Sequence, residues 1–466
     1  MKSSKHFFVV VLLCYSTTTL AARDQDSFAP VERTARQRSQ KAIIWEREQK
    51  AREQTLAEVR RLARIPLTPN VAAQIALLNN RDLQSTFEEI GLARADLLQA
   101  RTISNPELNI SARFPDKLPS GTDLEWSIAQ NFLNLMMMPL KIKVAKAQLQ
   151  AAQLRVSDAV TRIVAEAKSA IYQLEAAEEI LTRLKLEQSA QAASLDLIQR
   201  LHEAGNITDL QLLQQQGEYS QSRLEIAQAE ADIRELREKL NRVMGLWGIE
   251  TDWRVDPKVP EVPGKDLSMR GLETLAITQR TDLAAAKAEL ESNLKALGLE
   301  KTFRWIGALE FGIDSERDTD SQTITGPTLR LELPIFNQGQ ARIARGEAEL
   351  RRAYDKLERK AVEIRSEVRE LRDKLISSRD IALFYRDTLI PVRTQTRDQM
   401  QLQYNAMIVG PIELFSARQQ EIAAERGYVT AKREYWVTRS ELERAVGGSL
   451  VRPLKSISKN PVSKQN

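Results

Sequence analysis

The chain is poor in several residue types, and each shortage excludes a class of protein. Its 466 residues include one cysteine, two histidines and only 5% aromatic residues. A single cysteine excludes an intramolecular disulfide and a multi-thiolate metal site. The formal net charge is +5, from 68 basic and 63 acidic residues, and so close a balance gives no case for nucleic-acid binding. Few aromatics with 28% charged residues favour long packed helices over a globular enzyme core.

Long apolar runs are also missing once the N-terminus is set aside. No later segment approaches the ~20 apolar residues that a membrane-spanning helix needs. Residues 1–22 predict a secretory signal peptide, because Lys2 and Lys5 precede an apolar run that ends in small residues. The alternative is a lipoprotein acylated on Cys14, although the bulky Leu13 stands where a small residue is expected. If the chain crosses a membrane, it therefore does so as strands.

Glycine and proline are absent from Leu140 to Ala204, where average composition would supply several. Apolar residues there alternate steps of four and three, which is the period of a left-handed coiled-coil seam. The seam consists of Val156, Val160, Ile163, Ala167, Ala170, Leu174, Ala177, Leu181 and Leu184. The same alternation returns from Leu350 to Leu375. The sequence thus predicts two very long helices, each of which needs partners along its length.

Two pairs of short segments follow a period of two instead, with strands expected at about 106–133 and 305–335. Their length and alternation are typical of transmembrane β-barrel strands. Four strands cannot close a barrel alone, so several copies must contribute. The apolar face would meet outer-membrane lipid and the polar face would line a wet lumen. The lumen candidates are Glu107, Asn109, Arg113, Glu310, Arg330 and Glu332.

Landmarks recur about 200 residues apart, as Asp82 and Leu83 do in Asp282 and Leu283, which indicates a duplication. A single helix is expected from about Val71 to Thr102. The second long helix is expected to bend at Gly346 and Pro391. The predicted organisation is a signal peptide (1–22), a charged, partly helical arm (23–69), repeat 1 (70–250, helical hairpin about 140–245), a linker (251–268), repeat 2 (269–448, helical hairpin about 340–446) and a basic tail (449–466).

This order of motifs resembles the outer-membrane factors, the TolC-like export ducts of tripartite efflux pumps and type I secretion. The resemblance is carried by 100–106 (ARTISNP), 333–342 (LPIFNQGQAR) and 404–414. The segment 67–84 is similar to the heavy-metal-efflux subgroup related to CusC and CzcC. The resemblance implies a mainly α fold with a membrane β-barrel portion. It also implies a homotrimer in the outer membrane, whose twelve-stranded barrel continues into a twelve-helix periplasmic tunnel.

In that family the turns of the helical hairpins form the periplasmic tip, where an inner-membrane adaptor docks and the pore closes. The corresponding tip residues here are Ala204 and Gly205 in repeat 1, and Ala406, Met407 and Gly410 in repeat 2. Met407 stands where a glycine is usual. The resemblance therefore leaves the geometry of the second tip open.

The family also commonly places two acidic residues around the closed pore in the second repeat. Glu413 falls where the first belongs, but Ser416 replaces the second, so a cation-binding ring here would be weaker. The alternative reading of Glu413 is a solvated acid in the first turn of a helix, where the helix dipole favours it.

No nucleophile, base and orienting group come together in the sequence, and no glycine-rich phosphate loop is present. We therefore expect no catalytic residues, no cofactor and no enzyme. His6 lies in the leader, so His202 has no histidine partner for a metal site. The run Met136 to Met138 suggests copper(I), which thioether sulfur suits, but consecutive positions point in different directions and packing or lipid contact is the other reading.

The leading hypothesis is a passive outer-membrane exit duct fed by a periplasmic adaptor and an inner-membrane pump of the resistance-nodulation-division type. Heavy-metal ions are the first expected substrate, and organic drugs or type I secreted substrates are the alternative. A hypothesis of another class is a periplasmic coiled-coil scaffold or adaptor without a pore. The alternating strand segments favour the duct over the scaffold, because a scaffold without a pore does not need hairpins with an apolar outer face.

Overall fold

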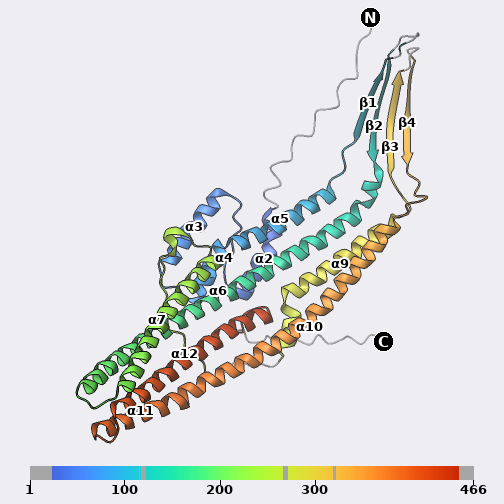
Figure 1. Cartoon of the computed structure of the whole chain (residues 1–466). Coiled ribbons are helices and arrows are strands. Elements are labelled where there is room, and N and C mark those ends of the chain that lie inside the picture. The colour runs from blue at the N-terminus through green and yellow to red at the C-terminus, as the bar shows by residue number, and fades with distance from the viewer. Residues whose placement is uncertain (1–23, 115, 117–121, 266–270, 318–321, 451–466) are drawn as a thin grey trace, which may run out of the picture.

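The computed structural model describes residues 24–114, 116, 122–265, 271–317 and 322–450. Long helices run from a small sheet at one end to two helix turns at the other, and the short helices α2, α3 and α4 lie beside their middle (Figure 1). The mainly helical fold class predicted from the sequence is thus confirmed. The predicted signal peptide, with His6 and Cys14, and residues 451–466 of the basic tail lie outside the described residues.

The sheet is a four-stranded antiparallel meander built by both repeats. Its strands are β1 (Glu107–Arg113), β2 (Asp123–Asn131), β3 (Leu309–Arg317) and β4 (Thr323–Leu331), in that spatial order. The two hairpins join through β2 and β3, where Ile128 lies opposite Ile313. Within the described residues, the outer edges of β1 and β4 carry no further strand.

The longest helix, α6 (Phe132–Glu203), has 72 residues and is about 110 Å long at 1.5 Å per residue. It begins directly after β2, eight residues before the expected start, because the Asn131 side chain accepts a hydrogen bond from the Asn134 backbone N–H at 3.0 Å. Pro139 lies inside the helix without ending it. The return helix is α7 (Asp209–Met244).

The helix expected from Val71 to Thr102 is wrong as a single element, because the chain breaks at Asn80 into α4 (Pro69–Asn79) and α5 (Arg81–Arg101). The Asn80 side chain caps α5 by accepting from the Leu83 N–H at 2.9 Å. Its Nδ2 also donates to the Val243 carbonyl of α7 at 2.9 Å. One asparagine therefore ends one helix, begins the next and fastens both to the return helix.

Repeat 2 has the same break, between α8 (Leu272–Gln279) and α9 (Thr281–Thr302). Here Arg280 replaces the asparagine, and its Nη1 donates to the Ala445 carbonyl at 3.4 Å. The carbonyl belongs to the end of α12 (Pro411–Val446), the counterpart of α7. The two breaks thus make the same kind of contact, from a side chain to a carbonyl near the end of a return helix, through different residues.

Each return helix ends at a glycine that no larger residue could replace without strain. Gly245 has φ +66°, and a Cβ there would lie 2.5 Å from the Asn79 carbonyl oxygen. Gly447 has φ +90° in the equivalent place. Both positions need the left-handed conformation that glycine adopts readily.

The outgoing helix of the second hairpin is interrupted, unlike α6. It consists of α10 (Gln340–Phe384), a π-helical turn η2 (Tyr385–Leu389) and α11 (Ile390–Asn405). At Gly346 the helix α10 continues without interruption and lies against Leu297, so the bend expected there stays a prediction. The interruption precedes Pro391, whose ring clashes with the carbonyl four residues earlier and has no N–H to donate.

The charged arm before repeat 1 forms α2 (Asp24–Ser39) and α3 (Gln49–Ala63). Phe28 and Val59 are buried in the same apolar core as the first repeat. The ring of Phe28 meets the edge of Phe87, with centroids 5.1 Å apart. Such aromatic contacts and the shared core join the arm to the rest of the molecule.

The linker between the repeats packs into the molecule, where Val259 and Val262 are buried. The Val259 N–H donates to Glu179 of α6 at 3.0 Å, and its carbonyl accepts from Lys432 of α12 at 3.2 Å. The Trp436 indole also donates to the Pro260 carbonyl at 2.8 Å. The linker therefore binds both repeats at once.

Candidate functional site

The strand register collects the predicted lumen residues on one face of the sheet. Glu310 lies opposite Arg330, and their side chains are 3.1 Å apart. Glu332 lies one residue beyond β4, but its backbone N–H donates to the Ala308 carbonyl at 2.9 Å and so continues the ladder. On β1 the same face carries Glu107, Asn109 and Arg113. Their role in a lumen stays a prediction.

The opposite face of the sheet is apolar and open. Ile110 and Trp126 are partners across β1 and β2, and the Ile110 side chain is 67% exposed. The other exposed apolar side chains of this face are Leu108, Leu124, Ile128, Phe311, Ile313, Leu329 and Leu331. A sheet with one polar and one apolar face fits a wall between water and lipid.

The turn of the first hairpin closes at Gly205, which has φ +77°. The Gly205 N–H donates to the His202 carbonyl at 2.9 Å, and the Asn206 N–H donates to the Leu201 carbonyl at 2.9 Å. This pair of bonds is the Schellman arrangement that ends many helices.

The second tip has the same geometry although Met407 replaces the glycine. Met407 has φ +58°, and its N–H donates to the Tyr404 carbonyl at 2.9 Å. The Ile408 N–H donates to the Gln403 carbonyl at 2.9 Å. The question left open by the sequence is thus answered: the backbone turn is retained, and a 94% exposed methionine side chain projects from it.

Replacing Met407 with glycine is expected to stabilise the second tip by about 0.5 kcal/mol. A side chain in the left-handed region costs about 1–2 kcal/mol, and the greater freedom of glycine in the unfolded chain returns about 0.4–1 kcal/mol of that. Hydrogen exchange of the 402–410 amides measures the effect as slower exchange. In the control Ala406→Gly, φ is −85° and exchange should become faster. Faster exchange in Met407→Gly would contradict the assigned strain.

The gate candidates Glu413 and Ser416 lie in the first two turns of α12 and are both exposed. Three residues apart on a helix, they share a face. Gly410 precedes the helix in an extended conformation, with φ −79° and ψ 171°. Glu413 is placed where the helix dipole favours a carboxylate, so its role as a gate stays a prediction.

Ion pairs join the two helical hairpins, and their partners were not identified from the sequence. Arg426 of α12 lies 3.1 Å from Glu225 of α7, and Arg183 of α6 lies 3.2 Å from Glu425. Lys432 is 2% exposed and lies 3.3 Å from Glu179. In the sequence these residues read as solvated helix faces or interhelical pairs, and their partners could not be named because they lie on the other repeat.

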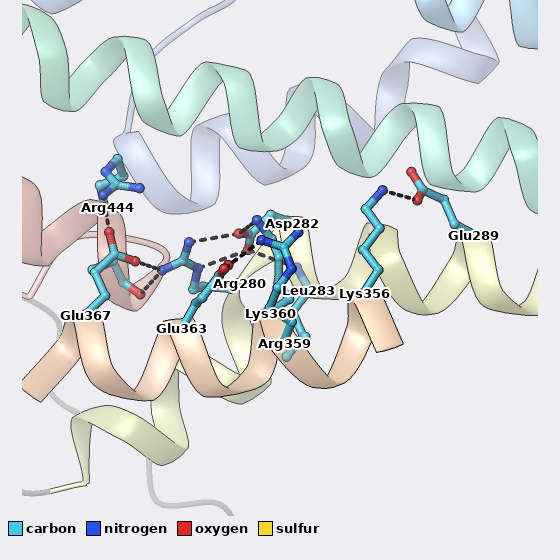
Figure 2. A network of polar contacts seen from close by, with 11 residues as sticks. Arg280, Asp282, Leu283, Glu289, Lys356, Arg359, Lys360, Glu363, Glu367 and Arg444 are labelled. Carbon is cyan, nitrogen blue, oxygen red and sulfur yellow. Dashed lines mark hydrogen bonds and ion pairs between the residues drawn. The ribbon is translucent and has the colours of Figure 1, made fainter. Parts of the chain in front are cut away.

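A second charged cluster fastens the helix break of repeat 2 (Figure 2). Arg280 holds Asp282 at 2.8 Å and also bonds Glu367, which Arg444 binds from α12. Lys360 lies 3.0 Å from Asp282. Burial alone would raise the pKa of the Asp282 carboxyl, but the bonds and charges of Arg280 and Lys360 outweigh it and lower the pKa to about 2.

Within the described ranges, no helix is long and apolar enough to span a bilayer. Nor do three or more His, Cys, Asp or Glu side chains of the described residues gather to hold a metal ion. Met136 to Met138 are consecutive on α6, so their side chains are spread around the helix by about 100° per residue.

The sequence and the fold are similar to those of known proteins. The family model for outer membrane efflux proteins matches residues 72–246. The cobalt-zinc-cadmium resistance protein CzcC of Cupriavidus metallidurans is 25% identical over 293 residues, which are 60% of this chain and 65% of CzcC, so the match spans just under two thirds of that relative. A crystal structure of CusC matches with a TM-score of 0.68 and 17% identity, covering 84% of this chain and 94% of CusC. The CmeC outer membrane channel of Campylobacter jejuni matches with a TM-score of 0.70 and 15% identity, covering 82% and 85%.

The fold is that of the outer-membrane factors, and the resemblance read from the sequence is confirmed. The chain is similar in sequence to CzcC over the matched part and shares the fold of CusC. The predicted location, the outer membrane with an extension into the periplasm, is confirmed by the same similarities.

Proposed function

We propose that the chain is the outer-membrane duct of an efflux system, a passive exit channel and not an enzyme. The observation that carries the proposal is the four-stranded sheet, which is polar on one face, apolar on the other, and continuous with the helix α6, about 110 Å long. The two proposed repeats, 70–250 and 269–448, each supply a strand hairpin and a helical hairpin. Glu107, Arg330 and the other residues of the polar strand face line the water-filled interior.

The duct is a homotrimer in this proposal. The outer edges of β1 and β4 would leave backbone groups unpaired in lipid, so each edge needs the strand of a neighbouring protomer. Three copies give twelve strands. A groove of about 590 Å³ between α9 and α10 supports this assembly, because Leu290, Leu294 and Leu350 line it and a second copy would cover them.

Energy and delivery come from partners in this proposal, a periplasmic adaptor and an inner-membrane pump of the resistance-nodulation-division type. The adaptor meets the tips around Gly205 and Met407, and Glu413 is the candidate gate beside them. Heavy-metal ions are the proposed cargo, supported by the similarity to CzcC, which is called a cobalt-zinc-cadmium resistance protein. Organic drugs or type I secreted substrates remain the alternative cargo.

Reconstitution tests the duct. The mature chain, extracted in detergent, is expected to purify as a trimer and to give single-channel conductance in planar bilayers. A monomer that stays soluble without detergent and gives no conductance would instead favour a periplasmic scaffold.

Deletion of the gene tests the cargo separately. We expect lower tolerance to cobalt, zinc or cadmium, restored by the intact gene, with unchanged tolerance to dyes and detergents. The reverse pattern would move the assignment to organic substrates and leave the duct itself unaffected.

A further inference from the structure

A pocket of about 240 Å³ lies where the charged arm meets both repeats, beside the middle of α6. The end of α2, the start of α4 and the end of α12 form its other walls. Three cationic side chains line it, and they come from three different elements: Arg38, Lys168 and Arg444. Neither the duct nor the tips use this pocket, so its role is independent of the proposed function.

Among the described residues, two of the three cations of the pocket form an ion pair with a carboxylate. Lys168 has a carboxylate partner, Glu443, at 3.1 Å. Arg444 forms an ion pair with Glu367, which does not line the pocket. Nη1 of Arg38 is buried and has no hydrogen-bond partner among the described residues. A buried guanidinium nitrogen without an acceptor costs free energy that a bound anion would recover.

A fourth cation, Lys41, lies next to the pocket and donates to the Asn70 carbonyl at 2.7 Å. Burial, together with the charge of Lys168, lowers the pKa of Lys41 to about 8. Burial also lowers the pKa of Arg38, although the carboxylate of Asp158 opposes that shift. Like charges held together inside the protein are a place where an anion is bound favourably.

We propose that this pocket binds a small oxyanion, of the class of inorganic phosphate or sulfate, with the Arg38 guanidinium as its main donor. Lys41 and Lys168 supply the remaining positive charge. The bound anion would bridge the arm, α6 and the end of α12. It would thereby hold the arm against both repeats. Without the anion, the two repeats are joined at this point by the ion pair between Lys168 of α6 and Glu443 of α12.

Isothermal titration of the full mature chain in detergent with sodium phosphate at pH 7, in a chloride buffer, tests the proposal. We expect saturable binding of one phosphate per protomer and a higher Tm with phosphate. Arg38→Gln should weaken binding at least tenfold. The matched control Arg33→Gln, on the same helix but exposed and bonded only to the Ala29 carbonyl among the described residues, should bind as the wild type does.

Absence of saturable binding by the wild type, or wild-type affinity in Arg38→Gln, would overturn the proposal. If Arg38→Gln does not fold, judged by its circular dichroism, Lys41→Gln replaces it and should weaken binding several-fold. Glycerol 1-phosphate, which carries a phosphate group like that of a lipid, is titrated in parallel. Tighter binding of glycerol 1-phosphate assigns the pocket to phosphomonoesters, and tighter binding of phosphate assigns it to the free ion.

Discussion

Replacing Ile110 with arginine is expected to abolish assembly in the outer membrane. Ile110 lies in the centre of β1 on the apolar face of the sheet, with two thirds of its side chain exposed (67%). An arginine at the bilayer midplane of a β-barrel costs about 2–4 kcal/mol. Each protomer of the proposed trimer would carry that cost.

The matched control is Asn109→Arg, one residue earlier on the same strand. Successive strand residues face opposite sides, so Asn109 lies on the polar face with Arg113. We expect Asn109→Arg to assemble as the wild type does. The measurement is the fraction of protein recovered from outer membranes as a heat-modifiable trimer. Equal recovery of both variants would show that the apolar face does not meet lipid.

Replacing Arg280 with methionine is expected to destabilise the second repeat by about 1.5–3 kcal/mol, the contribution of hydrogen bonds to charged groups. The stem of the side chain is retained, but Asp282 and Glu367 lose a cation that is itself only 8% exposed. Asp282 keeps Lys360 and Glu367 keeps Arg444, so each carboxylate loses one of its two cations together with the hydrogen bonds that Arg280 donates. Urea denaturation and hydrogen exchange of the α8 and α9 amides measure the loss.

An exposed ion pair in the same repeat provides the control. Arg369 and Glu273 are 3.9 Å apart with side chains 57% and 40% exposed. Arg369→Met should therefore cost no more than about 1 kcal/mol. Equal losses in the two variants would contradict the special role of the Arg280 cluster.

The same cluster predicts a pH dependence. The pKa of Asp282 is lowered to about 2 in the folded chain, against about 3.9 in an unfolded one. The stability contributed by this carboxylate is present above pH ~4 and is lost as the pH falls toward 2. Arg280→Met has already lost most of it, so the stability of the variant should fall less steeply over that range.

The long helices and the strands could be predicted because their signals are local. The seam of α6 repeats every 3.5 residues, and Val156, Ala167 and Leu174 are indeed buried. The strand alternation likewise placed Leu108 and Asn109 on opposite faces. The exposed end of the second seam, at Tyr354, lines the α9–α10 groove instead of a buried seam.

The features that escaped prediction depend on contacts between residues far apart in the chain. Asn80 and Arg280 break their helices because of carbonyls 163 and 165 residues away. Lys432 is buried because Glu179, 253 residues earlier, lies beside it. The left-handed conformation of Met407 could not be predicted either. The turn between α11 and α12 requires it, whereas the helix propensity of methionine does not indicate it.

The position of the linker has a consequence for how the polypeptide matures during synthesis. Glu179 precedes its ammonium partner, Lys432, by 253 residues and is therefore synthesised well before it. A prematurely terminated polypeptide that lacks α12 would therefore leave both Glu179 and the hydrophobic side chain of Val259 without their cover. Truncated chains that lack α12 should consequently be degraded by proteases faster than chains that contain it.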